Sequence, residues 1–307
     1  HVQFVFERQW QALRAAAHAR GILLFGDLPL FVALDSADVW AHRALFALDA
    51  EGRPTRVAGV PPDYFSETGQ LWGNPLYEWE AHERERFRWW VERLRTQLAR
   101  FDLVRIDHFR GLEACWEIPA GARTAMEGRW VPAPGMRLLE RLRRAFGGLP
   151  LVAEDLGVIT PAVEALRERF GLPGMRVLQF AFGGDAANPH LPHNHVPHAV
   201  VYTGTHDNDT TVGWHAALEP GARAHLEAYL GGAAGEMPWP LLRMALASVA
   251  RLAVIPMQDA LGLGSEARMN RPGRTEGNWR WRFQWDQVPS DLAARLRGLL
   301  GLYGRLA

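Results

Sequence analysis

The feature that most constrains the fold is a regular alternation of short apolar runs with longer amphipathic segments. The apolar runs predict buried strands at 21–27, 101–107, 150–155, 175–180, 199–207 and 251–259. The amphipathic segments predict helices at about 2–17, 80–99, 137–146, 160–171 and 287–305. Because strands that are apolar on both faces need helices on both sides, the alternation predicts a parallel sheet, either open and doubly wound or closed into a (β/α)8 barrel.

Polar residues at the ends of these runs favour the closed barrel. They are Asp27, Asp107, Glu154, Gln179, Asp207 and Gln258. Barrel active sites are assembled from several strand ends, whereas an open sheet concentrates its ligand at one switch point. A barrel has eight strands, and the chain opens on a helical pattern over 2–19. We therefore expect an α/β chain that lacks the first two strands of a (β/α)8 barrel, a C-terminal fragment.

Charge and composition narrow the class of partner. The 34 basic and 34 acidic residues cancel, so we expect neither nucleic acid nor a membrane surface as partner. Every basic residue is Arg, which argues against a P-loop because its phosphate clamp needs a lysine. No G-x-G-x-x-G follows the first strand. The lone Cys115 forms no internal disulfide, and without a signal peptide or long apolar span we expect a cytoplasmic protein.

The stretch VRIDHF (104–109) places charged residues in and after a buried strand. Residues two apart on a strand share a face, so Arg105 and Asp107 should point to the same side. Arg105 can then hold the Asp107 carboxylate ionised and oriented, as a nucleophilic carboxylate requires. A structural ion pair explains the same stretch equally well.

Two more strand ends carry carboxylates. In VAEDLG (152–157), neighbouring residues face opposite ways, so we expect Glu154 to face inward and Asp155 to cap the next helix or pair outside. In TGTHDND (203–209), Asp207 follows His206, and Gly204 allows a close approach of the backbone.

Histidines are the candidate metal ligands. Neither His108 nor His206 has a Cys or His at a typical zinc spacing, so we expect hydrogen bonds to a polar substrate instead. The loop PHLPHNHVPH (189–198) is richer in histidine, but its prolines predict irregular backbone. We expect no metal and no cofactor.

Three carboxylates on separate strand ends, without a phosphate loop or a nucleotide motif, favour glycosyl chemistry. Glycosidic bonds are broken by a pair of carboxyl groups, about 5–5.5 Å apart in the retaining form. Asp107 and Glu154 fit these two roles, and Asp207 would hold sugar hydroxyls more tightly as the ring distorts.

Five ordered blocks give the sequence a family resemblance. They are PPDYFSETGQLWGNPLY (61–77), VRIDHFRG (104–111), VAEDLG (152–157), TGTHDND (203–209) and EGNWRWRF (276–283). Together they resemble the 4-α-glucanotransferases of glycoside hydrolase family 77, also called amylomaltases or disproportionating enzymes. The resemblance implies that residues 1–307 are a catalytic barrel portion, about strands three to eight, with a long active-site loop insertion near 28–78.

The resemblance also implies roles for single residues. Asp107 would be the nucleophile, Glu154 the general acid and base, and Asp207 the stabiliser of the transition state. Substrate-binding positions would be Arg105, His108, His206, Tyr64, Phe65, Trp72 and Asp27, of which the three aromatic residues belong to a loop over the acceptor side. The partners would be an α-1,4-glucan or maltooligosaccharide donor and acceptor. The sequence does not indicate an oligomeric state.

Two other functions stay open at this point. An α-glucan hydrolase would share the carboxylates but resolve the intermediate with water. A glucan-binding fragment would lack activity because the N-terminal part is missing.

Overall fold

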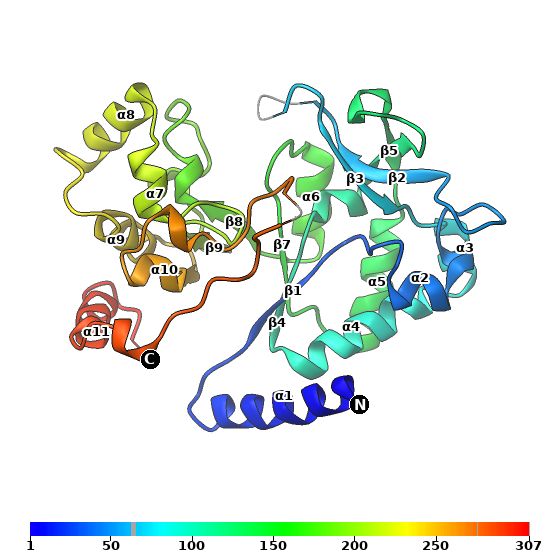
Figure 1. Cartoon of the computed structure of the whole chain (residues 1–307), viewed down its shortest axis with the longest axis horizontal. Coiled ribbons are helices and arrows are strands. Elements are labelled where there is room, and N and C mark those ends of the chain that lie inside the picture. Colours follow the sequence, from blue (N-terminus) through cyan, green and yellow to red (C-terminus); the bar gives the residue numbers. More distant parts are fainter. Residues whose placement is uncertain (63–65, 275, 307) are drawn as a thin grey trace. The chain divides into compact units, whose positions relative to one another are not determined.

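The computed structural model describes residues 1–62, 66–274 and 276–306 (Figure 1). The chain divides into two compact units, unit 1 (His1–Gly174) and unit 2 (Met175–Ala307). Both units combine helices with parallel strands, so the fold is mixed α/β.

A parallel sheet in the order β1-β4-β7 forms the centre of unit 1 (Figure 1). Its strands are β1 (Phe25–Leu28), β4 (Leu103–Ile106) and β7 (Leu151–Ala153). Asp27 is in register with Arg105, and Arg105 with Val152. Because residues in the same register of a parallel sheet face the same side, Asp27 and Arg105 share one face of it.

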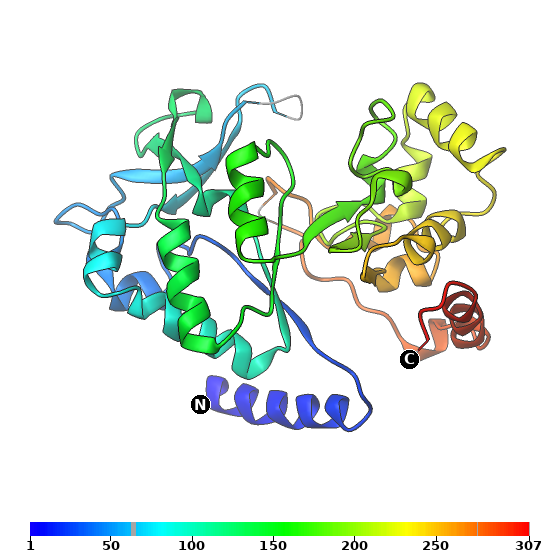
Figure 2. The same ribbon diagram turned by 180° about the vertical axis from the view of Figure 1, so that it is seen from behind.

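Helices cover this sheet and complete the core of unit 1. They are α1 (Val2–His18), α2 (Ala37–Ala41), α3 (Trp79–Arg84), α4 (Arg88–Arg100), α5 (Gly135–Phe146) and α6 (Pro161–Arg169). Figure 2 shows α5 and α6 nearest the viewer. Leu94, Leu138 and Val163 from α4, α5 and α6 are fully buried with the strand residues Val104 and Leu151. None of the helices in the described part of the chain is both long and apolar enough to span a bilayer.

The helix predicted over 80–99 is broken in two. Arg86 and Phe87, between α3 and α4, both have positive φ angles, 52° and 54°. The break buries the Phe87 side chain, which is 5% exposed, in the core. Trp89 and Trp90 in α4 are buried as well. Periodicity alone does not reveal such a break, because Phe87 also fits a helical apolar stripe.

The helix predicted over 160–171 is α6, with Pro161 at its first position. Gly171 follows the helix in the left-handed conformation, with φ at 60°. Thr160 is the N-cap residue of this helix, and its side chain makes no capping hydrogen bond.

An antiparallel sheet in the order β3-β2-β5-β6 was not predicted. Its strands are β2 (Arg56–Val60), β3 (Gln70–Pro75), β5 (Ala114–Pro119) and β6 (Arg129–Pro132). The first two lie in the segment predicted as a loop insertion near 28–78, and the others follow β4. Buried Glu117 joins the strands, because its carboxylate lies 3.1 Å from Arg56 Nη1 and 2.8 Å from Arg129 Nη2.

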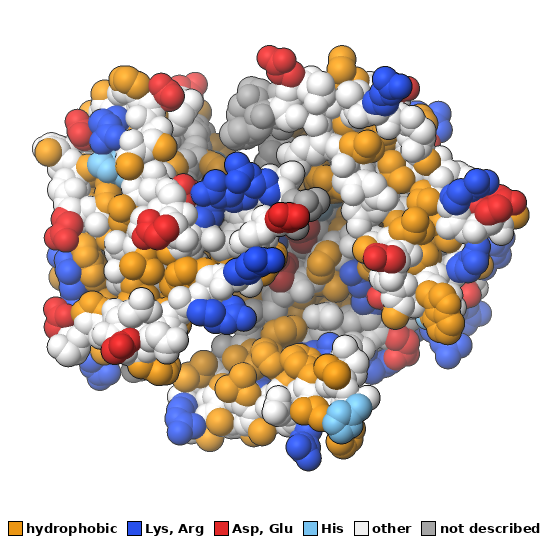
Figure 3. Space-filling view, viewed as in Figure 1, with side chains coloured by type: hydrophobic (Ala, Val, Ile, Leu, Met, Phe, Trp, Pro, Cys, Tyr) orange, Lys and Arg blue, Asp and Glu red, His pale blue; other side chains and the backbone are white. Residues whose placement is uncertain are grey.

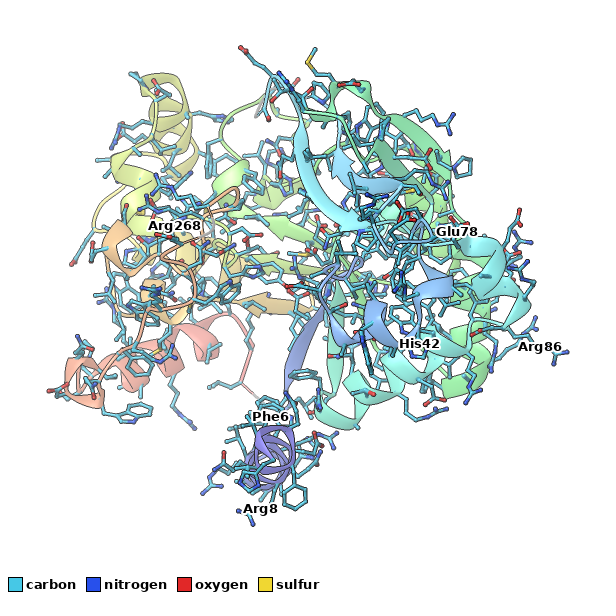
Figure 4. All side chains as sticks on the ribbon, turned by 45° about the vertical axis from the view of Figure 1, so that its right-hand side comes forward. Phe6, Arg8, His42, Glu78, Arg86 and Arg268 are labelled. Carbon is cyan, nitrogen blue, oxygen red and sulfur yellow. The ribbon has the colours of Figure 1, made fainter. Side chains whose placement is uncertain are left out.

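Helix α1 packs against α4 and buries none of its residues fully. Apolar side chains gather over it in Figure 3, and Val2, Phe4 and Leu13 are more than half exposed. Phe6 and Arg8 lie on opposite sides of the helix (Figure 4).

Unit 2 has its own sheet, in the order β10-β9-β8, in which β9 and β10 run parallel. The strands are β8 (Gly174–Val177), β9 (Ala199–Tyr202) and β10 (Leu252–Val254). The helices are α7 (Thr211–Ala216), α8 (Pro220–Leu230), α9 (Trp239–Ala247), α10 (Met257–Ala260) and α11 (Leu292–Leu302).

Short 3-10 helices complete both units. They are η1 (Arg43–Leu45), η2 (Phe109–Leu112), η3 (Ala125–Glu127), η4 (Leu178–Phe180), η5 (Pro192–Asn194), η6 (Ser265–Ala267) and η7 (Trp285–Gln287).

Each of the predicted apolar runs overlaps one strand of the two three-stranded sheets, so the strand positions are confirmed. The strands are shorter than the runs. In the run 251–259, for example, the chain turns from β10 into α10, so the polar end leaves the sheet. The prediction of a (β/α)8 barrel is confirmed only as a mixed α/β fold. The described residues form separate sheets and no closed ring of strands.

Candidate active site

Arg105 links two carboxylates at the carboxyl end of the unit 1 sheet. Its Nε donates to Asp27 Oδ1 at 2.9 Å, and its Nη2 donates to Asp27 Oδ2 at 2.6 Å and to Asp107 Oδ1 at 3.0 Å. The contact with Asp107 is the one that strand spacing predicts. Burial alone would lower the pKa of Arg105, but Asp27 first and Asp107 second raise it, so the guanidinium stays charged. The site therefore holds a fixed cation beside Asp107.

Glu154 lies beside Asp107 because both directly follow neighbouring strands. Ile106 is in register with Ala153, and the Glu154 N–H donates to the Ile106 carbonyl at 3.0 Å. Neighbouring strands are about 4.8 Å apart, so the two carboxyl-bearing residues extend the same register at the same edge.

Backbone amides hold both oxygens of the Glu154 carboxyl group. Oε2 accepts from the His108 N–H at 2.7 Å and Oε1 accepts from the Leu156 N–H at 2.8 Å. Burial and then the charge of Asp107 nevertheless raise the pKa of Glu154 to about 7, against the lowering effects of these amides and of Arg105. At neutral pH the group is therefore balanced between its acid and base forms, as a proton donor that later accepts requires.

His108 adopts a left-handed backbone, with φ at 51°, directly after Asp107. This conformation is unusual for a residue with a Cβ, and here it accompanies the amide contact with Glu154. The ring meets Trp72 edge to face at 4.8 Å between centroids. Burial, and next the charge of Arg110, lower the pKa of His108 to about 4, so the ring is neutral at pH 7. Its Nε2 is buried and has no hydrogen-bond partner among the described residues.

Asp155 faces away from Glu154, as strand alternation predicts. Its Oδ2 lies 3.5 Å from Nε of Arg167 on α6, and both side chains are largely buried. Asp155 thus pairs with a helix residue, as one of the two expectations for it has it, while the inward position of Glu154 stays a prediction.

Trp72 is the member of the predicted aromatic loop that the structure describes. It lies in β3, with its indole N–H donating to Gln70 Oε1 at 3.1 Å and its side chain 38% exposed. Tyr64 and Phe65 fall outside the described residues. Unit 1 thus brings together Asp27, Arg105, Asp107, His108, Glu154 and Trp72.

Asp207 and His206 belong to unit 2, on the loop after β9. Asp207 Oδ1 accepts from Asn270 Nδ2 at 2.6 Å and lies 3.5 Å from His206 Nε2. The His206 ring packs against Trp279 at 5.2 Å between centroids. Arg268, labelled in Figure 4, donates from Nη2 to the Asp207 carbonyl at 2.6 Å. Convergence of Asp207 with Asp107 and Glu154 stays a prediction.

Sequence reasoning missed Asn270 and Arg268. Each lies about 60 residues after Asp207, and a contact over such a separation leaves no trace in local spacing. The only local signal is the polar run RMNRPGR (268–274) between α10 and the block at 276–283.

The histidine-rich loop binds neighbouring protein groups. His190 Nδ1 accepts from the Val177 N–H at 3.1 Å, and His195 Nδ1 lies 2.7 Å from Ser248 Oγ. In the part of the chain that the structure describes, no three His, Cys, Asp or Glu side chains gather in a way that could hold a metal ion.

Comparison with known proteins assigns the family. The family model of glycoside hydrolase 77, described as 4-alpha-glucanotransferase, matches residues 1–288. The chain belongs to glycoside hydrolase family 77.

Curated 4-alpha-glucanotransferases extend the match. The chain is 58% identical over 312 residues to the 4-alpha-glucanotransferase of Thermus thermophilus, covering 99% of this chain and 62% of the relative. It is 54% identical to the Synechocystis enzyme of that name, with 99% and 61% covered. It is 50% identical to the chloroplastic/amyloplastic enzyme of Arabidopsis thaliana, with 99% and 54% covered. The chain thus spans less than two thirds of these relatives' length.

Two solved amylomaltase structures share the fold. The amylomaltase of Streptococcus agalactiae, solved in complex with acarbose, superposes with a TM-score of 0.94 at 37% identity. That match covers 99% of this chain and 62% of the other. The amylomaltase of Corynebacterium glutamicum gives a TM-score of 0.78 at 20% identity, which speaks for the fold alone, over 99% and 49% of the two chains.

Proposed function

We propose that the complete gene product containing this chain is a 4-α-glucanotransferase. It moves α-1,4-glucan segments from one maltooligosaccharide to the 4-hydroxyl of another, or back onto the same chain, by a retaining double displacement. Family membership supports the reaction class, and the related amylomaltase that binds acarbose, a glucan-like ligand, supports the substrate class.

The observation that carries the proposal is that two adjacent carboxyl groups lie in different electrostatic surroundings. Asp107 is bound by a buried guanidinium, whereas burial and the charge of Asp107 raise the pKa of Glu154 to about 7. A retaining glycosidase needs one ionised nucleophile and one protonated acid at the same linkage. A structural ion pair alone would not require a second, protonated carboxyl group beside it.

The two carboxyl groups would act in sequence. The Asp107 carboxylate attacks the anomeric carbon while Glu154 gives its proton to the departing glycosidic oxygen, leaving a glucosyl ester on Asp107. Glu154, now ionised, then takes the proton of the acceptor 4-hydroxyl, whose oxygen attacks the ester carbon and frees Asp107. Asp207 would stabilise the positive charge that develops on the sugar in both steps.

The other predicted residues would hold sugars around this centre. Neutral His108, with its unpartnered Nε2, suits a hydrogen bond to a sugar hydroxyl, and Trp72 supplies an apolar surface beside it. Arg105, Asp27 and His206 would line the same sugar position. Tyr64 and Phe65 would complete the acceptor side with Trp72, so that a sugar hydroxyl rather than water resolves the ester.

The remaining expectations extend this proposal to the whole molecule. Residues 1–307 would contribute strands three to eight of a (β/α)8 catalytic barrel, with the active-site insertion near 28–78 folded on the antiparallel sheet. The reaction as written uses no cofactor or metal. We keep the cytoplasm as the proposed location, although the name of the Arabidopsis relative places that enzyme in plastids.

Incubation of the complete gene product with maltotriose tests the proposal. Transfer predicts glucose together with a ladder of longer maltooligosaccharides, which chromatography resolves. Glucose and maltose alone would indicate a hydrolase, and binding without turnover would indicate a glucan-binding protein; either result contradicts transfer.

Asp107→Asn should abolish turnover while oligosaccharide binding persists.

A further inference from the structure

A short segment of unit 2, residues 268–270, is hydrogen-bonded to the loop that carries Asp207. Besides the contacts of Asn270 Nδ2 and Arg268 Nη2 with Asp207, the Asn270 N–H donates to the His206 carbonyl at 3.1 Å. Arg268 Nε donates to the Asn270 carbonyl at 2.9 Å. These hydrogen bonds fix both the backbone and the carboxylate of Asp207 from one three-residue segment.

The two oxygens of the Asp207 carboxylate differ in their hydrogen bonding. Oδ1 receives the 2.6 Å hydrogen bond from Asn270 and faces His206 at 3.5 Å. Oδ2 receives no hydrogen bond from the described residues, and the side chain is 43% exposed. An amide bound to one oxygen thus leaves the other available to a substrate while limiting rotation about χ2.

The charge of the partners also fits a reaction with a cationic transition state. Arg268 binds the backbone carbonyl of Asp207, and the group that meets the carboxylate at short distance is a neutral amide. A guanidinium on the same oxygen would oppose the positive charge that develops on the sugar ring. A neutral donor orients the carboxylate without that cost.

We propose that Asn270 is a positioning residue for Asp207, holding its carboxylate in the orientation that stabilises the transition state. The inference rests on the proposed function, which gives Asp207 its role. The charged and titratable groups at this position are Asp207 and His206 on the loop after β9 and Arg268 on the segment itself.

The test is the pH dependence of Asn270→Asp in the complete gene product. At pH 8 the new carboxylate cannot donate and repels Asp207, so kcat for maltotriose disproportionation should fall by about 10- to 100-fold, with a smaller change in KM. At lower pH the two carboxyl groups share a proton, which restores a donor to Asp207. The ratio of mutant to wild-type kcat should therefore rise as the pH is lowered from 8 to 5.

Two further variants separate positioning from folding. Asn270→Ala should lose kcat by a similar factor at every pH, because it has no donor to regain. Asn194→Asp is the matched control: Asn194 Nδ2 donates to the carbonyls of Ala186 and Asn188 at 2.8 and 2.9 Å, and its variant should keep wild-type kcat at both pH values. Thermal unfolding of each variant reports any loss of structure.

Wild-type kcat in Asn270→Asp at pH 8 would overturn the inference, and so would a deficit that does not change with pH. Asp207→Asn distinguishes this failure from failure of the proposed function. If Asp207→Asn is inactive while both Asn270 variants are fully active, only the positioning role falls. If Asp207→Asn is fully active, the role of Asp207 falls and the positioning role with it.

Discussion

Arg105 determines the charge around the candidate nucleophile. Its side chain is 9% exposed and meets two carboxylates with three hydrogen bonds, two of them to Asp27 in a bidentate pair. A planar guanidinium presents several N–H groups in fixed directions, and an ammonium does not. Period-two alternation predicts the pairing of Arg105 with Asp107. The two hydrogen bonds from Arg105 to Asp27 depend on the register of the neighbouring strands, which the sequence does not specify.

Arg105→Lys should therefore impair catalysis although the charge is kept. One ammonium cannot hold both carboxylates in the same geometry, so we expect kcat for maltotriose to fall by about 100-fold. The matched control is Arg56→Lys, since Arg56 also links two carboxylates, those of Glu78 and Glu117, in the antiparallel sheet. Wild-type turnover in Arg105→Lys would show that the pairing is not needed for catalysis.

The pKa of Glu154 predicts how the activity changes on the alkaline side of the pH profile. The general acid must carry its proton, and the protonated fraction falls as the pH rises through the pKa of about 7. We expect kcat/KM to decrease above about pH 7, by roughly tenfold per pH unit. Initial rates of maltotriose disproportionation from pH 5 to pH 9 provide the measurement, and a constant kcat/KM up to pH 9 would exclude Glu154 as the acid.

At the scale of elements, polar residues placed just after buried strands build the unit 1 site. The apolar runs predict these strands because burial on both faces selects apolar residues regardless of tertiary detail. The antiparallel sheet escapes prediction because β2 carries a register shift between Val57 and Gly59 and its ion pairs place charged residues within strands. The left-handed turn at His108 is also invisible in sequence, because no glycine marks it.

Helix α1 is an element that several polar contacts tie to the rest of unit 1. Asp102 accepts hydrogen bonds from Arg14 Nη2 at 2.9 Å and from the Leu24 N–H at 2.8 Å, and its other partner is His18 Nε2 at 2.9 Å. Burial alone would raise the pKa of Asp102, but these hydrogen bonds lower it from 3.8 to about 2. The carboxylate therefore holds the helix above about pH 4, and this contribution is lost as the pH falls toward 2.

Asp102→Asn should loosen α1 at neutral pH. A helix of this length is marginally stable without tertiary contacts, so backbone amides over 2–18 should exchange hydrogen about tenfold faster or more in the variant. Exchange in α5 should stay unchanged. Glu92→Gln is the control, because Glu92 forms an exposed pair with Arg95 within α4. Unchanged exchange over 2–18 in Asp102→Asn would show that the Asp102 carboxylate does not hold the helix.

At the scale of the whole molecule, the sequence blocks of family 77 are divided between the two units. Unit 1 carries the blocks with Trp72, Asp107 and Glu154, and unit 2 carries those with Asp207 and Trp279. The sequence predicts the three candidate carboxylates Asp107, Glu154 and Asp207 because each follows a recognisable strand. The sequence does not predict the residue that holds the Asp207 carboxylate, because the hydrogen-bond partner of Asp207 lies 63 residues away in the chain.

The central claim is that Asp107 forms a covalent bond to the sugar, and trapping that ester tests it most directly. Glu154→Gln in the complete gene product should still react with an α-maltosyl fluoride, because fluoride leaves without a proton, but it lacks the base that resolves the ester. Mass spectrometry of the digested protein should then find one maltosyl group on the peptide that contains Asp107. A maltosyl group on another residue, or fluoride release with an unmodified Asp107 peptide and no burst, would contradict the account.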